Sequence, residues 1–417
     1  MKTRVLLSAL ILGLFAAPVL ADSWMPFQDM RVVSPSGKTY VVIKQQEGGV
    51  AWELCRRAEG AEPMKGATAD DAYGLRKGSG GSIERDPADT LIGSGRVDQR
   101  PVRVRVLDEP AAFVLFEKYG SVGHGDALIY VDGRRGVVFR RKLEDLFDAK
   151  TRGTFLETVS SIWWHQGIAV DEEAKQILVV AAGDRLSQVG LAKGRVTRPE
   201  KEVLLRGFSR GLPAERELCL ETAARLKPEG LHAKALAIAR DENESAGIRM
   251  RAAVAVRRSG GAEDFSALFI KGTEQDQPGE IRSYAVSNLG EIAGEEAMPK
   301  LRQLMRGEAD NDVWHPAQTA FVSLGEKAVP TLIEMLLEEG ESSDYRGGAA
   351  HALGKIGSPA SVNALLTATA TAEESVAGAA VNAAIKIGAP DLGRRLAEIL
   401  EKGSTQDARI ARYLKKH

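Results

Sequence analysis

Apolar residues in the second half of the chain recur with a helical period, and the pattern itself repeats. Ile281, Ala285 and Leu289 are each four residues apart, so they share one face of a helix. A degenerate copy of the pattern starts near Glu215. Clearer copies start near residues 248, 281, 313, 345 and 376, at spacings of 33, 32, 32 and 31 residues. Self-similarity at a period of about 20–50 residues indicates stacked supersecondary units.

Each repeat is predicted to contain two helices. Pro299 and Pro330 fall near the first turn of a second helix, where a missing N–H costs least. Because one helix pair cannot bury its apolar stripe alone, neighbouring pairs must stack. We therefore expect an α-solenoid of about six helix pairs over residues 213–402. Between the two helices comes a glycine that suits a left-handed helix end, at residues 260, 294, 325, 357 and 388.

The end of the chain, residues 403–417, is expected to form a capping helix. Ser404 is the predicted N-cap. Ile410 and Leu414 would point inward. Lys415 and Lys416 would lie at the C-terminus, where cations suit the helix dipole.

The repeats follow the pattern Ile-Arg-x-x-Ala-Ala/Val, then Leu-Gly-x-Ile, then Pro-x-Leu. This pattern resembles the HEAT-like repeats of the phycobilisome-lyase type over roughly the C-terminal half of the chain. The resemblance implies that Arg249, Arg282 and Arg346 pair with acids of a neighbouring repeat. Trp314 and Ala377 replace this arginine in two repeats. Such arrays serve as scaffolds, regulators and a few bilin lyases, so the resemblance implies a fold and leaves the function open. The best copies are residues 281–304 and 345–366.

Residues 22–199 change to the alternating pattern of strands. Val102, Val104 and Val106 alternate with Arg103 and Arg105, which predicts one buried and one solvated face. Asp132-Gly133 indicates the turn of a hairpin. Further strands are expected at residues 31–33, 40–43, 113–116, 128–131, 137–139, 177–180 and 194–196, and a short helix at 143–147.

The architecture of this β-rich domain is less regular than that of the repeats. Residues 34–40 resemble the turn of a propeller blade, but such segments do not recur evenly, which favours an irregular sheet or sandwich. Residues 59–99 are rich in Gly and charged residues and are predicted to form a long loop, with a short helix around 69–75. The predicted fold class is α+β multidomain, a β-rich domain followed by an all-α HEAT-like superhelical solenoid.

The start of the chain has the pattern of a secretory signal peptide over residues 1–21. A basic tetrapeptide precedes an apolar run at residues 5–17, and Val19 and Ala21 are the small residues before a cleavage site at Asp22. The run is shorter than the roughly 20 residues that span a bilayer. We expect a periplasmic or secreted protein, with an uncleaved anchor as the alternative. Cys55 lies too far along for a lipid-anchored terminus.

Composition narrows the possible partners. A formal net charge of −1 over 417 residues argues against a general nucleic-acid binder, and no integral membrane segment is expected after signal removal.

The two cysteines, Cys55 and Cys219, could form a disulfide or could each be a buried small hydrophobe. The sequence contains no P-loop, no His-Glu-x-x-His and no cysteine pair at metal spacing. We therefore predict no catalytic, metal-binding or cofactor-binding residues, and no cofactor.

Aromatic and histidine residues supply the candidate partner-binding positions. Trp163 and Trp164 are adjacent on an expected strand and must face opposite ways, so one would be core and the other exposed for a partner. His165 follows them. Trp314 and His315 replace the usual start of their repeat, which could mark a binding spot or only packing.

His124 is the remaining candidate. It lies between Gly123 and Gly125, where Asp126 could orient it. The alternative interpretation is a tight turn with an exposed histidine.

Three functions are compatible with these patterns. We favour an exported, non-enzymatic interaction or scaffold protein that binds a protein or peptide with its solenoid. The second is an enzyme or a tetrapyrrole-handling protein, by fold analogy. The third is a structural subunit of an envelope assembly. Convergence of His124 and Asp126 in a cleft would favour the enzyme, whereas a groove lined by second helices would favour the binder.

Overall fold

The computed structural model describes residues 27–64, 83–118, 121–158, 161–209, 211–307, 311–403 and 406–415. The predicted signal peptide at 1–21 and the predicted helix around 69–75 lie outside the described residues. The chain forms two compact units, Met1–Glu229 and Gly230–His417. Among the described residues, every helix is too short or too polar to cross a membrane.

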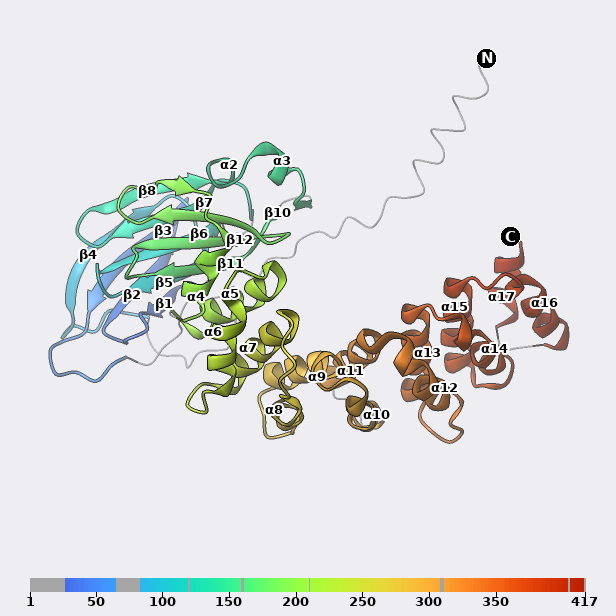
Figure 1. The fold of residues 1–417 in the computed structure, drawn as a ribbon. Helices are drawn as coiled ribbons and strands as arrows, with labels where there is room; N and C mark the ends of the chain where they lie inside the picture. Colours follow the sequence, from blue (N-terminus) through green and yellow to red (C-terminus); the bar gives the residue numbers. More distant parts are fainter. Residues whose placement is uncertain are drawn as a thin grey trace, which may run out of the picture. The chain divides into compact units, whose positions relative to one another are not determined.

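The first unit contains three four-stranded antiparallel sheets, in which strands follow one another in chain order (Figure 1). A two-stranded ribbon, β9 (Leu156–Glu157) with β10 (Ile162–Trp163), joins the second sheet to the third. The strands of the sheets are β1 (Met30–Val33), β2 (Thr39–Gln46), β3 (Gly49–Arg56) and β4 (Thr90–Val97); β5 (Pro101–Leu107), β6 (Ala112–Lys118), β7 (Asp126–Asp132) and β8 (Gly136–Lys142); β11 (His165–Asp171), β12 (Gln176–Ala181), β13 (Arg185–Gly190) and β14 (Val196–Thr197).

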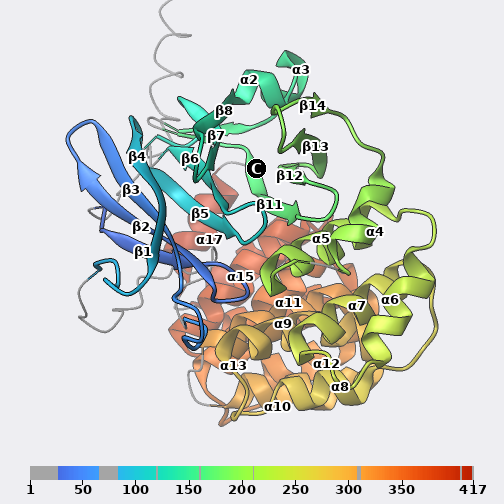
Figure 2. The same cartoon turned by 90° about the vertical axis from the view of Figure 1, so that its left-hand side faces the viewer.

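The sheet β5–β8 is the middle layer and is buried on both faces (Figure 2). Side chains of β6 alternate between two cores. Phe113 packs against β1–β4, where its ring meets Trp52 edge-on at 5.2 Å between centroids. Val114 and Phe116 face β11–β14. One core lies between the first and second sheets and another between the second and third, so the three sheets of the described residues form a layered sandwich.

Two expectations for this unit were wrong. The alternating pattern predicted a solvated face for Arg105. Its side chain is only 2% exposed, because β5 belongs to the middle layer. The predicted loop 59–99 contains β4, which pairs with β3 over most of its length. Residues 58–64 and 83–89 remain irregular, and from them Met64 and Ile83 cover a small cluster around Tyr40.

The described residues of the first unit also form four short helices and one long helix: α2 (Leu143–Leu146), α3 (Ala149–Arg152), η2 (Lys201–Val203), α4 (Leu204–Gly207) and α5 (Pro213–Leu226). The predicted helix at 143–147 is confirmed by α2. The degenerate repeat copy near Glu215 forms α5, which belongs to the β-rich unit. Two ion pairs attach α5 to the sheets: Arg105–Glu215 at 2.7 Å and Arg225–Asp184 at 2.8 Å.

The second unit is a two-layer helical array (Figure 1). The first helix of each predicted repeat lies in one layer of the array. Successive first helices pack against one another. Pro299 and Pro330 lie in the first turns of second helices, as predicted. The first helices are α7 (Ala246–Arg258), α9 (Gly279–Ala293), α11 (Asn311–Leu324), α13 (Ser343–Ile356) and α15 (Glu374–Ile387). The others are α6 (Leu231–Arg240), α8 (Ser266–Gly272), α10 (Met298–Arg306), α12 (Val329–Leu337), α14 (Val362–Thr371) and α16 (Leu392–Lys402).

Glycines follow the first helices at their C-terminal ends, as the sequence predicted. Gly357 and Gly388 follow α13 and α15 with φ of 79° and 70°, a conformation that glycine adopts without strain. The last helix is α17 (Asp407–Leu414), in which Ile410 is fully buried and Leu414 half-buried. The predicted N-cap Ser404 lies outside the described residues.

Two of the three arginines at the second position of the repeats, Arg249 and Arg346, have a different role from the one that the resemblance implied. Arg249 donates from Nε to the carbonyl of Ala239 at 3.2 Å, and Arg346 donates to the carbonyl of Leu336 at 3.0 Å. Both acceptors lie in the last turn of the preceding helix, where carbonyls lack helical partners and the dipole favours a cation. In the described residues, these two arginines therefore cap helices instead of pairing with acids.

Candidate functional site

A hollow of about 420 Å³ lies along the first helices α11, α13 and α15. Trp314 and His315 of α11 line one side, and Lys355 of α13 lines another. A second hollow of about 610 Å³ shares Ser375 and Ala379 with the first and continues to α17. We call these two adjoining hollows the groove. It is lined by first helices, so it is not the groove of second helices that would have favoured a binder over an enzyme.

Small residues form the floor of the groove. A Cβ atom added to Gly347 would meet only the Cβ of Ala379, at 3.9 Å, which is ordinary contact. Gly348, the next residue, is covered instead: a Cβ there would lie 2.9 Å from Trp314 Cζ2 and 2.8 Å from Met305 Cε. The Trp314 ring therefore rests on Gly348. Its Nε1 is buried without a hydrogen-bond partner among the described residues, which is uncommon for a buried donor.

Charges are separated along the groove. Asp344 lies at the start of α13, while His351 and Lys355 lie in its second half. Burial lowers the pKa of His351, and Lys355, Lys386 and His315 lower it further, so the imidazole is neutral at pH 7. The first hollow thus has an acidic edge at the start of α13 and a basic edge toward its end, whereas the second hollow places Arg409 beside Glu373 and Glu374.

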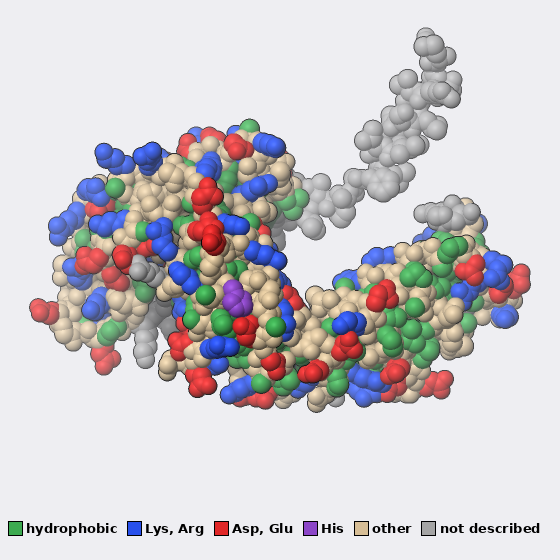
Figure 3. Space-filling view, viewed as in Figure 1, with side chains coloured by type: hydrophobic (Ala, Val, Ile, Leu, Met, Phe, Trp, Pro, Cys, Tyr) green, Lys and Arg blue, Asp and Glu red, His purple; other side chains and the backbone are tan. Residues whose placement is uncertain are grey.

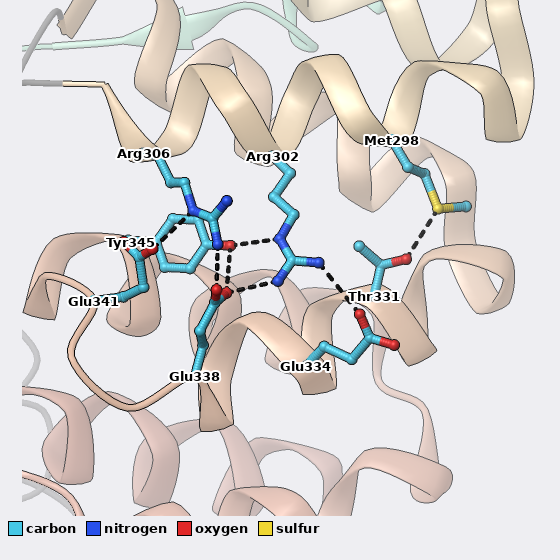
Figure 4. Close-up of polar contacts among 8 residues, drawn as sticks. All are labelled: Met298, Arg302, Arg306, Thr331, Glu334, Glu338, Glu341 and Tyr345. Carbon is cyan, nitrogen blue, oxygen red and sulfur yellow. Dashed lines mark hydrogen bonds and ion pairs between the residues drawn. The ribbon is translucent and has the colours of Figure 1, made fainter.

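A polar network fixes the start of α13, from which the groove residues follow (Figure 4). Arg302 of α10 donates from Nε to Tyr345 Oη at 2.8 Å and pairs with Glu338 at 2.6 Å. Arg306 pairs with Glu338 and, at 2.8 Å, with Glu341. Arg302 is the first cause of the lowered pKa of Glu338. The network therefore joins α10 to the loop before α13 and holds Tyr345 in place.

The two floor glycines give a matched prediction. Gly347→Ala should raise the free energy of unfolding by about 0.5–1 kcal/mol, because alanine favours a helix and finds room there. Gly348→Ala should lower it, because overpacking costs about 1–3 kcal/mol where Trp314, Met305 and Gln318 leave no space. Urea denaturation of both variants checks the pair. Equal stabilisation by the two substitutions would mean that Trp314 does not rest on Gly348.

The other tryptophan candidates lie in the first unit. Trp164 is fully buried in the core between the second and third sheets, whereas Trp163 is 38% exposed, so the predicted opposite orientation is confirmed. Trp163 lies opposite Leu156 in the β9–β10 ribbon, and Leu156 is 68% exposed. His165 is half-buried, with its ring 4.9 Å from that of Phe116.

His124 has an exposed side chain in the turn before β7. Asp126 does not orient it, because the Asp126 carboxylate pairs with Arg140 at 2.7 Å. Both cysteines are free thiols: Cys55 is buried beside Tyr40, and Cys219 is buried against Gly207. The disulfide that the sequence left open is therefore not formed.

Glu117 is a buried carboxylate that the sequence did not indicate. Glu117 is fully buried at the end of β6 with φ of 67°, a strained conformation for a residue with a Cβ. Its Oε2 accepts from the Gly123 N–H at 2.8 Å. Burial raises the pKa of Glu117 to about 8, and burial lowers the pKa of His165 to about 4. Only the polar end of an apolar strand marked this position in the sequence.

These two groups predict how stability depends on pH. Between pH 4.5 and 8 the folded state keeps a Glu117 proton that the unfolded state has lost, so a rising pH destabilises the fold. Between pH 4 and 6.5 the unfolded state binds a His165 proton that the folded state lacks, so a rising pH stabilises the fold. The two effects oppose each other up to pH 6.5, and above it only the loss remains.

We therefore expect Glu117 to reduce the free energy of unfolding by up to about 1.4 kcal/mol per pH unit between pH 6.5 and 8. The variant Glu117→Gln should show a flatter dependence over that window, measured by urea denaturation at each pH. Parallel curves for the two proteins would contradict a raised pKa.

In the described residues, no group of three or more His, Cys, Asp or Glu side chains could hold a metal ion. Acidic and basic side chains are interspersed over the face drawn in Figure 3. The polar edges of the groove and its half-buried tryptophan are suited to holding a polypeptide segment.

Of the comparisons with known proteins, the family match lies in the helical array. No curated protein matches the chain. Among solved structures, human deoxyhypusine hydroxylase in complex with glycerol matches with 14% identity and a TM-score of 0.21, over 45% of this chain and 84% of that chain. Residues 329–414 match the family model of HEAT repeats, and the strand-rich part has no family match. The array is thus a HEAT-repeat solenoid in this region, a class whose extended surfaces suit protein interactions.

Proposed function

We propose that this protein is an exported, non-enzymatic interaction protein whose helical array binds an extended segment of a protein partner in the groove. The observation that carries the proposal is the half-buried Trp314 beside an open floor at Gly347. An aromatic side chain at the wall of a hollow is a typical anchor for a partner. The HEAT-repeat match at residues 329–414 supports an interaction role for α13 and α15, whereas α11 precedes the matched residues.

Filling the floor of the groove tests this function. Peptides would be selected on the full chain from a library of random 12-residue peptides, and their affinities measured by fluorescence anisotropy. Gly347→Leu places a side chain in the hollow, where its Cβ meets only the Cβ of Ala379 at 3.9 Å, and should abolish binding. Gly393→Leu in α16 is the matched control, since a Cβ there also meets one atom at 3.9 Å, on Leu414. Binding that survives Gly347→Leu would place the site elsewhere, and loss on Trp163→Ala would place it in the first unit.

Export is a separate part of the proposal and rests on the sequence of residues 1–21. The expected result is a mature protein that begins at Asp22, detected by mass spectrometry of the protein from a periplasmic or extracellular fraction. A chain that keeps its first residues in the cytoplasmic fraction would contradict export.

A further inference from the structure

The basic edge of the groove has charges without partners. Lys355 of α13 lines the groove, and Lys386 of α15 lies one helical turn beyond the groove residue Asn382. The two lysines occupy the same position in successive repeats, 31 residues apart, and both are exposed. Neither makes an ion pair with another described residue, although both lie near His351. Elsewhere in the array basic side chains pair with acids, as in Arg258–Glu291, Lys327–Glu295 and Arg394–Asp391.

The acids of the groove are too distant to neutralise this edge. Asp344 precedes Lys355 by eleven residues, which is about 16 Å along a helix. Glu373 and Glu374 occupy the corresponding place at the start of α15. At this distance the charges of an exposed surface are largely screened from one another at physiological salt. The two edges can therefore each attract a charge of opposite sign on a ligand.

We propose that the groove selects an extended acidic peptide segment, with a carboxylate between Lys355 and Lys386 and its backbone over Gly347 and Ala379. This inference rests on the proposed function, because it names the partner chemistry of the same groove. The glycine floor admits a backbone at close range, and Trp314 contacts the segment at one end. An acidic side chain gains a favourable interaction with each lysine, whereas a basic one is repelled.

The pKa of His351 is expected to respond to a carboxylate bound by the two lysines. The positive charges that face it are Lys355 on its own helix and Lys386 on α15, His315 faces it from α11, and Asp344 is the acid that lines the same hollow. A carboxylate that neutralises the lysines removes part of the cause that lowers the pKa of His351. That pKa should therefore rise when an acidic peptide binds, as followed by NMR of the imidazole.

The experiment compares each peptide selected on the full chain with the same peptide in which every Asp and Glu is replaced by Asn or Gln. The expected result is that selected peptides are rich in Asp and Glu, and that the amide versions bind about three- to ten-fold more weakly. Lys355→Gln with Lys386→Gln should cause a similar loss, and added salt should reduce the difference. Lys327→Gln is the control, because its partner Glu295 lies elsewhere in the array.

The outcomes separate the two proposals. Peptides that need the open groove but are neutral or basic, and that bind equally to the lysine variants, would overturn the acidic preference and leave the proposed function intact. An unchanged pKa of His351 on binding would also overturn it. Failure of Gly347→Leu to affect any selected peptide would overturn both.

Discussion

Arg105→Ala is expected to lower the free energy of unfolding of the first unit by about 3–5 kcal/mol. The side chain is 2% exposed and donates from Nε to Glu215 at 2.7 Å and from Nη2 to Glu172 at 3.1 Å. Nη1 donates to the Val106 carbonyl. Without the guanidinium, the Glu215 carboxylate stays 5% exposed beside an empty space. The carboxylate still accepts from the Leu212 N–H at 3.0 Å, but the loss of its buried charged partner removes a large part of the compensation for its desolvation.

Two controls identify burial as the cause. Arg135 is an arginine near β8 whose pair with Asp132 leaves it 61% exposed, so Arg135→Ala should cost at most about 1 kcal/mol. Replacing Arg105 and Glu215 together by leucine should cost less than Arg105→Ala alone, because neither charge of the buried pair remains. Urea denaturation measures all three proteins. A cost for Arg105→Ala no larger than that for Arg135→Ala would contradict an enclosed ion pair.

Arg105 also shows where a local sequence pattern fails. Its alternation with valines correctly predicted strand β5, because the period of two is a property of the strand itself. The environment of its side chain depends on Glu215, 110 residues further along, and on a sheet layer that no local pattern encodes. The same limit applies to Glu117, whose burial follows from the packing of the second sheet against Trp164 and its neighbours.

The array was predictable because the sequence pattern within each repeat specifies the helices of that repeat. The apolar period, the glycines at the helix ends and the prolines predicted two helices in each repeat. Both are observed. Trp314 was noticed because it departs from the repeat pattern, and the structure places it at the wall of a groove. The position of that groove on the first helices was not predictable, since it depends on how successive helices stack. The carbonyl partners of Arg249 and Arg346 were likewise hidden, because they belong to a different helix.

Leu353→Ala is expected to lower the free energy of unfolding of the array by about 2–5 kcal/mol. Leu353 is fully buried on the inner side of α13, at the central position of its repeat. Truncation removes apolar contacts and leaves a cavity, and both effects destabilise a close-packed core. The matched control is Leu337→Ala, since Leu337 is 38% exposed in α12 and its truncation removes less buried surface than that of Leu353.

The loss should also spread to neighbouring repeats. Each repeat of a solenoid contacts only its neighbours, so stability is approximately a sum of repeat terms and interface terms. Weakening α13 therefore weakens its interfaces with α11 and α15, which carry the groove. Hydrogen exchange should show faster opening of amides in α13 and α15 than in α7, whereas Leu337→Ala should leave the three helices alike. Uniform acceleration across the array would mean that it unfolds as one cooperative block, and an unchanged melt would mean that Leu353 does not occupy the core of its repeat.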